Sequence, residues 1–156
     1  VGGMICPDQR DERGFRIGFR IIDVLSGDSG WLARKDYRTG PRIGRYRVNV
    51  VDAERIGVEA LRRALERADV VVIDEVGPME LLVPSLKEAM IKALLSNKSV
   101  VAVVHYRLRD PRILDILKAH GYRWFTVTLD NRDKLPDLIA GLILDERAQQ
   151  AGPRRD

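Results

Sequence analysis

One run of aliphatic residues limits the folds available to this chain more than any other feature. Residues 70–73 read Val-Val-Val-Ile and lead directly into Asp74 and Glu75. An unbroken apolar run of strand length is typical of a strand buried on both faces, as in parallel sheets. Ligands of open α/β sheets bind just outside the carboxyl ends of such strands. The run therefore predicts a central strand that delivers two acids to a functional edge.

Helical and strand patterns alternate on both sides of this run. They predict strands at 1–6, 70–73, 99–104 and 124–129, and helices at 53–68, 85–95, 110–120 and from 130 or 131 to about 147. A β-hairpin is predicted at 16–25 and 31–33, and a further strand at 46–50. This order is typical of an α/β fold with a mostly parallel sheet and a hairpin insertion. We expect a single domain over 1–148 and a disordered tail over 149–156.

Local sequence also predicts where the helices begin and end. Asp52 is a suitable N-cap, Ser85 to Glu88 has the spacing of a capping box, and Asp110 precedes a proline at the first helical position. Gly121 is a suitable C-terminal cap. Asp130 or Asn131 is expected to cap the last helix.

Composition excludes some classes of protein and leaves others open. Charged residues make up 32% of the 156 residues, and no apolar run approaches the eighteen or so that a membrane span requires. The lone cysteine, Cys6, favours a reducing, cytoplasmic setting. A net charge of +4 keeps nucleic acid open as a partner, but the interleaved acids do not favour it. Arginine outnumbers lysine, a weak indication of a heat-tolerant source.

The Asp-Glu pair has a specific chemical interpretation. An aspartate at the end of such a strand holds Mg²⁺, usually through water, in P-loop NTPases. The neighbouring glutamate is then placed to deprotonate the attacking water. Val76 and Gly77, which follow the two acids, are further candidates for nucleotide binding, and Gly77 and Pro78 are expected to turn the chain away from the sheet edge. The alternative is a buried strand that simply ends in solvated acids.

Five collinear segments resemble the small nucleoside-triphosphatase family of P-loop NTPases. They are residues 3–10, 16–21 (Arg-Ile-Gly-Phe-Arg-Ile), 44–49 (Gly-Arg-Tyr-Arg-Val-Asn), 73–81 (Ile-Asp-Glu-Val-Gly-Pro-Met-Glu-Leu) and 131–133 (Asn-Arg-Asp). The resemblance implies a three-layer RecA-like fold and Mg²⁺-dependent hydrolysis of nucleoside triphosphates to diphosphate and phosphate. It implies that Asp74 organises Mg²⁺ and that Glu75 is the general base. It also implies that Asn131 and Arg132 lie near the nucleotide base, with a helix cap and a surface ion pair as their alternative roles.

The chain also departs from the family pattern. The family opens with Gly-x-x-Gly-x-Gly-Lys-Thr-Thr, and residues 1–156 contain no such segment. We expect that the first strand and phosphate-binding loop are missing by truncation, and that this chain by itself hydrolyses little or nothing. The alternative is a degenerate, non-catalytic module that acts through a protein or nucleic-acid partner. Val103 replaces a threonine that could sense the γ-phosphate, and His105 either contacts phosphate or hydrogen-bonds a loop.

Overall fold

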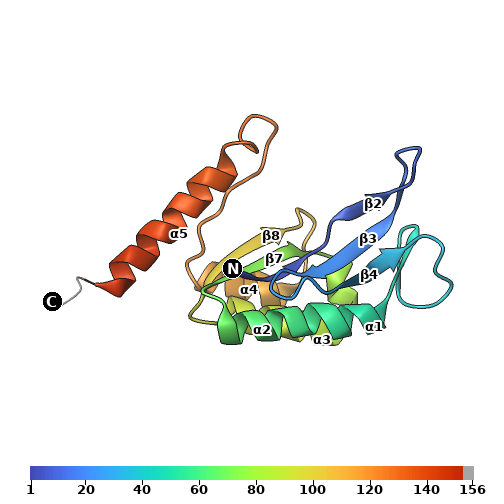
Figure 1. Cartoon of the computed structure of the whole chain (residues 1–156), viewed down its shortest axis with the longest axis horizontal. Coiled ribbons are helices and arrows are strands. Elements are labelled where there is room, and N and C mark those ends of the chain that lie inside the picture. The colour runs from blue at the N-terminus through green and yellow to red at the C-terminus, as the bar shows by residue number, and fades with distance from the viewer. Residues whose placement is uncertain (153–156) are drawn as a thin grey trace. The chain divides into compact units, whose positions relative to one another are not determined.

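The computed structural model describes residues 1–152. The chain divides into two compact units, Val1–Gly121 and Tyr122–Asp156, and each is described by itself (Figure 1). The second unit contains α5 (Leu135–Ala151), so residues 149–151 of the predicted tail form its last turn. The remainder of that tail, 153–156, lies outside the described residues.

The first unit is built on an eight-stranded sheet in the order β5-β6-β4-β3-β1-β7-β8, with β2 paired to β3. Parallel pairing is confined to β1 with β7 and β7 with β8, while all the other pairs are antiparallel. The sheet is therefore mixed, where the sequence predicted a mostly parallel one. The strands are β1 (Gly2–Ile5), β2 (Asp8–Arg10), β3 (Arg16–Asp23), β4 (Ser29–Arg34), β5 (Arg42–Ile43), β6 (Tyr46–Val48), β7 (Val70–Val76) and β8 (Ser99–Val104).

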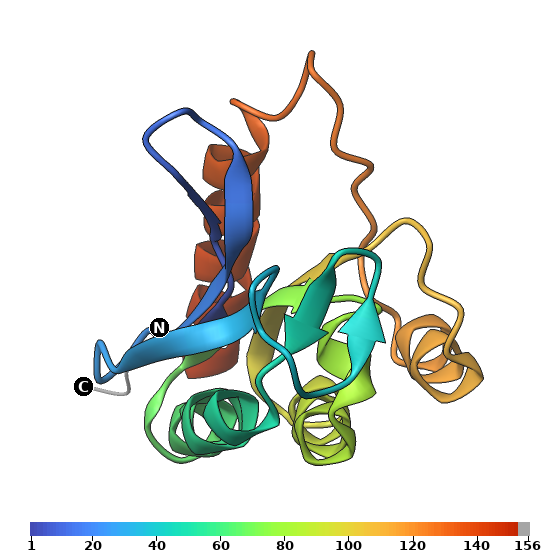
Figure 2. The ribbon, with the colours of Figure 1, turned by 90° about the vertical axis from the view of Figure 1, so that its right-hand side faces the viewer.

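The helices of the first unit lie on one face of this sheet (Figures 1 and 2). They are α1 (Val50–Asp52), the π-helical η1 (Ala53–Val58), α2 (Glu59–Arg67), the short 3-10 turn η2 (Glu80–Leu82), α3 (Pro84–Leu94) and α4 (Pro111–Ala119). The first three are continuous and correspond to the helix predicted at 53–68. This unit by itself thus has two layers, one of strands and one of helices.

Alternation along the strands decides which side chains enter the core. Met4, Val71 and Ile73 are fully buried, and the parallel pairing of β1 with β7 places Met4 level with Ile73. Leu61 of α2 and Leu86 of α3 are also fully buried. Burying aliphatic side chains of this size stabilises a fold by about 1.5–3 kcal/mol each. The core therefore lies between the helices and the paired strands β1 and β7, and it fixes the position of the β7 end.

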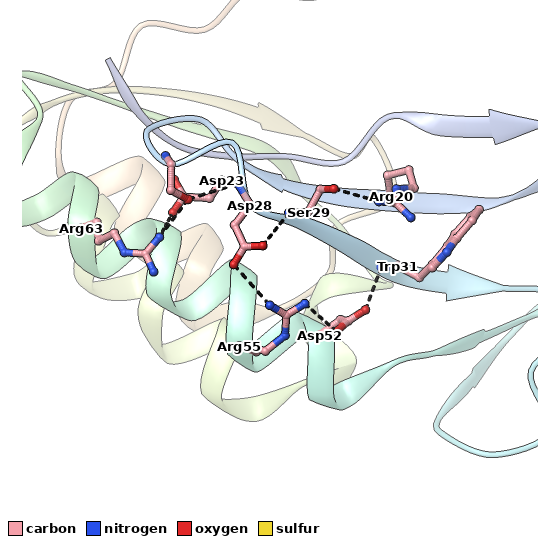
Figure 3. A network of polar contacts seen from close by, with 9 residues as sticks. Arg20, Asp23, Asp28, Ser29, Trp31, Asp52, Arg55 and Arg63 are labelled. Carbon is pink, nitrogen blue, oxygen red and sulfur yellow. Dashed lines mark hydrogen bonds and ion pairs between the residues drawn. The ribbon is translucent and has the colours of Figure 1, made fainter.

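A buried ion pair connects the β3–β4 hairpin to α2 (Figure 3). The Asp23 side chain is 0% exposed and accepts a hydrogen bond from Arg63, which also donates to the Ser26 hydroxyl. The backbone N–H groups of Leu25 and Ser26 donate to the same carboxylate at 2.9 and 3.3 Å. Burial raises the pKa of Asp23, but the hydrogen bonds and the Arg63 charge outweigh it and hold the pKa below its usual range.

A second polar cluster fastens the start of the helix to β4 (Figure 3). Asn49, not the predicted Asp52, caps the helix, because its side chain accepts from the Asp52 N–H. The Asp52 carboxylate instead accepts from the Trp31 N–H at 2.9 Å and pairs with Arg55. Arg55 also reaches Asp28 of the hairpin turn at 3.2 Å. The predicted cap residue is thus used for tertiary contact.

Two further helix starts were predicted with different success. Asp110 caps α4 through a 3.1 Å bond from the Ile113 N–H, which confirms that prediction. The prediction of a capping box at Ser85 is wrong. Helix α3 begins at Pro84 with no side-chain cap, and the Ser85 hydroxyl donates to the Glu54 carboxylate at 2.8 Å. The positive φ of Gly121, +67°, agrees with a C-terminal cap for α4.

The second unit differs most from the sequence prediction. Residues 124–129 form no strand, and α5 begins at Leu135 rather than at Asp130 or Asn131. The Asn131 side chain instead closes a loop, accepting from the Thr128 N–H and donating to the Thr126 carbonyl, both at 2.8 Å. An extended segment becomes a strand only when its backbone groups find a partner strand, which an apolar pattern alone does not supply.

Candidate active site at the end of β7

The carboxyl end of β7 is irregular where the two acids lie. Asp74 pairs with Val103 of β8 and Val76 pairs with Val104, so Glu75 is an extra residue on the β7 side of the ladder. The Asp74–Glu75 peptide bond is cis. The extra residue in the ladder makes this a β-bulge. A β-bulge takes a residue out of the regular strand pairing and changes the direction of its side chain, and bulges often lie beside active sites. Glu75 is therefore presented differently from an ordinary strand residue.

A pocket of about 150 Å³ opens at this edge. It gathers side chains from separate parts of the chain: the residue after β1, the middle of β3, the end of β7 and the turn that follows β7. The lining residues are Cys6, Phe19, Asp74, Glu75, Met79 and Glu80. The structure thus brings the two predicted acids together in one hollow, with a third acid that the sequence reasoning did not single out.

Asp74 keeps a carboxylate within reach of this pocket. Its side chain is half-buried, and burial raises its pKa, while a hydrogen bond from the Cys6 backbone opposes that rise. The pairing of Ile5 with Asp74 across β1 and β7 places Cys6 at this position. A partly desolvated carboxylate fixed from one side and open on the other suits contact with a hydrated cation.

Glu75 lies between two opposing influences. Burial raises its pKa, the neighbouring charge of His105 lowers it, and the Asp74 carboxylate raises it further, with an upward net shift. The His105 N–H donates to the Val76 carbonyl at 3.1 Å, which holds the residue after β8 against the end of β7. Its Nδ1 accepts from the Arg107 N–H at 3.1 Å. His105 therefore bonds its own loop, as one of its two predicted roles required, and also lies close enough to influence Glu75.

Glu80 was missed as a site residue, although it lies within the 73–81 segment. Its side chain is only 3% exposed and its Oε2 atom has no hydrogen-bond partner. Burial raises its pKa to about 8, with the charges of Glu75 and Asp74 adding to the rise. Burial likewise raises the pKa of the Cys6 thiol well above its usual value. The signal that could have revealed Glu80 is an acid between the apolar Met79 and Leu81, where a solvated face is not expected.

The other predicted residues of this segment have distinct places. Val76 is fully buried, so only its backbone is available at the site edge. A Cβ at Gly77 would lie 2.8 Å from Glu75 Oε1 and 2.9 Å from Glu80 Oε2, so a larger residue would collide with both carboxyl groups. Val103 is 48% exposed and pairs with Asp74 across β7 and β8. This is the position at which the family's threonine was expected to sense the γ-phosphate.

Asn131 and Arg132 belong to the second unit. The Asn131 amide is engaged by its own loop, as described above, and its backbone carbonyl accepts from the Leu135 N–H at 3.0 Å. Arg132 is exposed and lies 3.7 Å from Asp133. Their role at the nucleotide base stays a prediction.

Within residues 1–152, no group of three or more His, Cys, Asp or Glu side chains is arranged to enclose a metal ion. Over the same residues, no helix combines the length and the apolar character needed to cross a membrane.

A mixed sheet whose central parallel strand ends in an Asp-Glu pair at a pocket defines a RecA-like α/β nucleotide hydrolase. Comparison with known proteins agrees, because a family model described as "NTPase" matches residues 1–140. The chain belongs to this NTPase family, whose members in the comparison are nucleoside-triphosphatases of the THEP1 type.

Individual relatives support this assignment. The nucleoside-triphosphatase THEP1 of Thermofilum pendens is 47% identical over 141 residues, covering 90% of this chain and 77% of that protein. The Hyperthermus butylicus protein is 41% identical over 152 residues, covering 97% and 80%. The crystal structure of THEP1 from Aquifex aeolicus superposes with a TM-score of 0.78 at 28% identity, covering 91% of this chain and 83% of that one. The family and the RecA-like α/β class predicted from sequence are confirmed.

Proposed function

We propose that the protein hydrolyses nucleoside triphosphates, including ATP and GTP, to diphosphate and phosphate with Mg²⁺. The observation that carries the proposal is the presentation of Asp74 and Glu75 at one pocket on the carboxyl edge of β7. Ligands of open α/β sheets bind at this edge. The single thiol at Cys6 is in keeping with a reducing cytoplasm as the place of the reaction.

The donor set fits Mg²⁺. This ion keeps several waters and is commonly bound through one or two carboxylates and the substrate phosphates. Asp74 offers one half-buried carboxylate braced by the Cys6 backbone, and no closed cage of ligands surrounds it among the described residues. Asp74 would hold the ion through water. When bound, Mg²⁺ would neutralise charge on the phosphate oxygens.

Glu75 is suited to the proton transfer. Water attacks the γ-phosphorus, its proton passes to the Glu75 carboxylate, and the bond to the β-phosphate oxygen breaks to release the diphosphate. Burial raises the pKa of Glu75, which makes the carboxylate a stronger proton acceptor than an exposed glutamate. The charge of His105 beside it opposes part of this rise in the pKa. Asn131 and Arg132 would shape a base pocket tolerant of several nucleotides.

Phosphate binding needs further groups. In P-loop NTPases the phosphates rest on backbone N–H groups and a lysine of a glycine-rich loop. Residues 1–156 contain no Gly-rich Lys-Thr segment. Because phosphoryl transfer depends on positioning and charge stabilisation, we expect this chain alone to hydrolyse little or nothing.

The test measures phosphate release from ATP and GTP by a protein extended upstream through a Gly-rich Lys-Thr loop. We expect Mg²⁺-dependent turnover. Asp74→Asn should raise the Mg²⁺ concentration needed for half-maximal turnover. Glu75→Gln should lower kcat by about 100-fold or more while nucleotide still binds. Glu88→Gln is the matched control, since Glu88 is an exposed acid of α3 paired with Arg112.

Two results would contradict the proposal. One is turnover that survives Glu75→Gln within a fewfold of the unaltered protein. The other is an upstream sequence that encodes no Gly-rich Lys-Thr loop. Ready hydrolysis by the 156-residue chain would separately contradict the expectation that it is inactive alone.

A further inference from the structure

Glu80 is the most unusual ionisable group in the first unit. Its side chain is 3% exposed, and its Oε2 atom is buried without a hydrogen-bond partner. A buried polar atom left without a partner costs about 1–3 kcal/mol, and more for a charged group. A hydrogen bond to a neighbouring group would remove this cost. Oε2 could form one after a small side-chain rotation if it carried a proton.

The nearest candidate is Glu75. A Cβ built on Gly77 would lie 2.8 Å from Glu75 Oε1 and 2.9 Å from Glu80 Oε2, so the two carboxyl oxygens flank the same small space. The absence of a side chain at Gly77 is what leaves this space free. The two acids come from different elements, since Glu75 lies in β7 and Glu80 opens η2.

Burial raises the pKa of Glu80 most, the backbone N–H groups of Glu80 and Gly77 donate to its carboxylate and partly oppose that rise, and both charged side chains that act on it are acids. Asp74 and Glu75 face it from β7, and both raise its pKa; the Cys6 thiol faces it from the residue after β1. His105, after β8, influences Glu75. Among the described residues, no lysine or arginine lines the pocket. Two carboxyl groups that flank one desolvated space, with no lysine or arginine beside them, do not both ionise readily, so one retains a proton.

We propose that Glu80 is a positioning residue that holds a proton on Oε2 and donates it in a hydrogen bond to the Glu75 carboxylate. The inference rests on the proposed role of Glu75 as general base. The bond satisfies the buried oxygen and fixes the direction in which the base faces the attacking water. Glu80 touches no reacting atom, and it acts only through Glu75.

The arrangement predicts an upper pH limit for hydrolysis. Burial and the neighbouring carboxylates raise the pKa of Glu80 to about 8. Below this pH Glu80 carries its proton, and the hydrogen bond from Glu80 keeps the Glu75 carboxylate in position. Above it, two adjacent carboxylates repel each other, and Glu75 leaves its working position.

The same proton affects stability, which gives a test that needs no activity. The folded pKa of Glu80 is raised, so from pH 5 to 8 the folded chain binds one more proton than the unfolded chain. Its contribution to stability therefore falls as pH rises. One linked proton changes the unfolding constant by about tenfold per pH unit. Relative to Glu80→Gln, the unaltered 156-residue chain should lose stability with this slope.

Direct detection is available on the same chain. Infrared difference spectra at neutral pH should show a neutral carboxyl band that Glu80→Gln removes and Glu88→Gln leaves in place. Glu88 is the control because it is an exposed acid in an ion pair with Arg112. A neutral-pH spectrum without a band that depends on Glu80 would overturn the proposal.

Kinetics of the upstream-extended protein test the positioning role. Glu80→Gln keeps a hydrogen-bond donor, whereas Glu80→Met keeps the approximate volume without one. We expect Glu80→Met to lower kcat by about tenfold, the worth of one ordinary hydrogen bond, with little change in KM. Glu80→Gln should turn over faster than Glu80→Met and lose the decline near pH 8. A decline that persists in Glu80→Gln, or equal kcat in the two variants, would overturn the inference.

The two proposals fail in distinguishable ways. If the extended protein hydrolyses no nucleoside triphosphate, the proposed function is wrong. The carboxyl band and the pH slope of stability still decide whether Glu80 is protonated. If hydrolysis requires Glu75 but is indifferent to Glu80, only the positioning inference is wrong.

Discussion

Replacing Arg63 by methionine tests the most deeply buried charge of the fold. The variant keeps a long apolar side chain on α2 but removes the group that donates to Asp23 and to Ser26. The Asp23 carboxylate, 0% exposed, would keep its two backbone N–H donors and the hydrogen bond from the Ser26 hydroxyl. A buried charge that loses its partner retains the cost of leaving water without the compensating attraction.

The expected loss can be estimated from this geometry. Removing one partner of a buried ion pair typically costs 3–5 kcal/mol, and the remaining backbone and Ser26 hydroxyl donors to Asp23 reduce that to about 2–3 kcal/mol here. For a chain of this size each kcal/mol lowers Tm by about 2–4 °C. The variant should therefore melt about 5–10 °C below the unaltered protein at pH 7.

Urea unfolding followed by circular dichroism measures this loss. Arg62→Met is the matched control, because Arg62 is the adjacent α2 arginine and pairs with Glu59 and Glu66 on the exposed surface. Exposed pairs of this kind contribute little. The control should leave the unfolding midpoint nearly unchanged.

The pH dependence of the loss has a definite sign. The folded pKa of Asp23 is lowered, so its stabilising contribution is complete above the pKa of an unfolded aspartate. That contribution disappears as pH falls through the folded value. The difference between Arg63→Met and the unaltered chain should therefore shrink in acid. Equal losses for Arg63→Met and Arg62→Met, or a loss independent of pH, would refute the reasoning.

Three other substitutions test the packing of η1, the helix α5 and the end of β8 beside Asp74. Gly57→Ala should destabilise the fold by about 1 kcal/mol, since its Cβ would lie 2.7 Å from Ile21 Cδ1 and overpacking outweighs the better helix propensity. Gly141→Ala in α5 meets nothing within 4 Å and should stabilise by about 0.5–1 kcal/mol in the same urea assay. Val103→Thr places a hydroxyl opposite Asp74 and should raise phosphate release by the extended protein about two- to tenfold, whereas Val103→Ala should not.

The sequence predicted the strand β7 well because its signal is local. Four aliphatic residues before two acids specify a strand and the place of both acids at its carboxyl end within one short segment. The burial of Glu80 is not local in this way. It depends on Cys6 and Phe19, which reach the same pocket from β1 and β3, far away in sequence.

The capping and strand predictions that were wrong have one physical reason in common. Ser85 and Asp52 have side chains suited to helix caps, but each finds a tertiary partner, Glu54 and Trp31 respectively. The segment 124–129 is suited to a strand but has no paired neighbour among the described residues. Local preference is decided by the partner available, and the sequence pattern does not reveal which partner that is.

The last strand of the sheet, β8, has a consequence for how the molecule matures. A strand running parallel to its neighbour cannot be joined by a tight hairpin, because a parallel pair needs a crossover of a dozen or more residues. Any parallel strand that joins the outer side of β8 must therefore come from distant sequence, and distant pairings form late in folding. Until such a strand pairs there, the outer N–H and C=O groups of β8 can bind the edge of another chain, so a protein with this border uncovered should aggregate more readily.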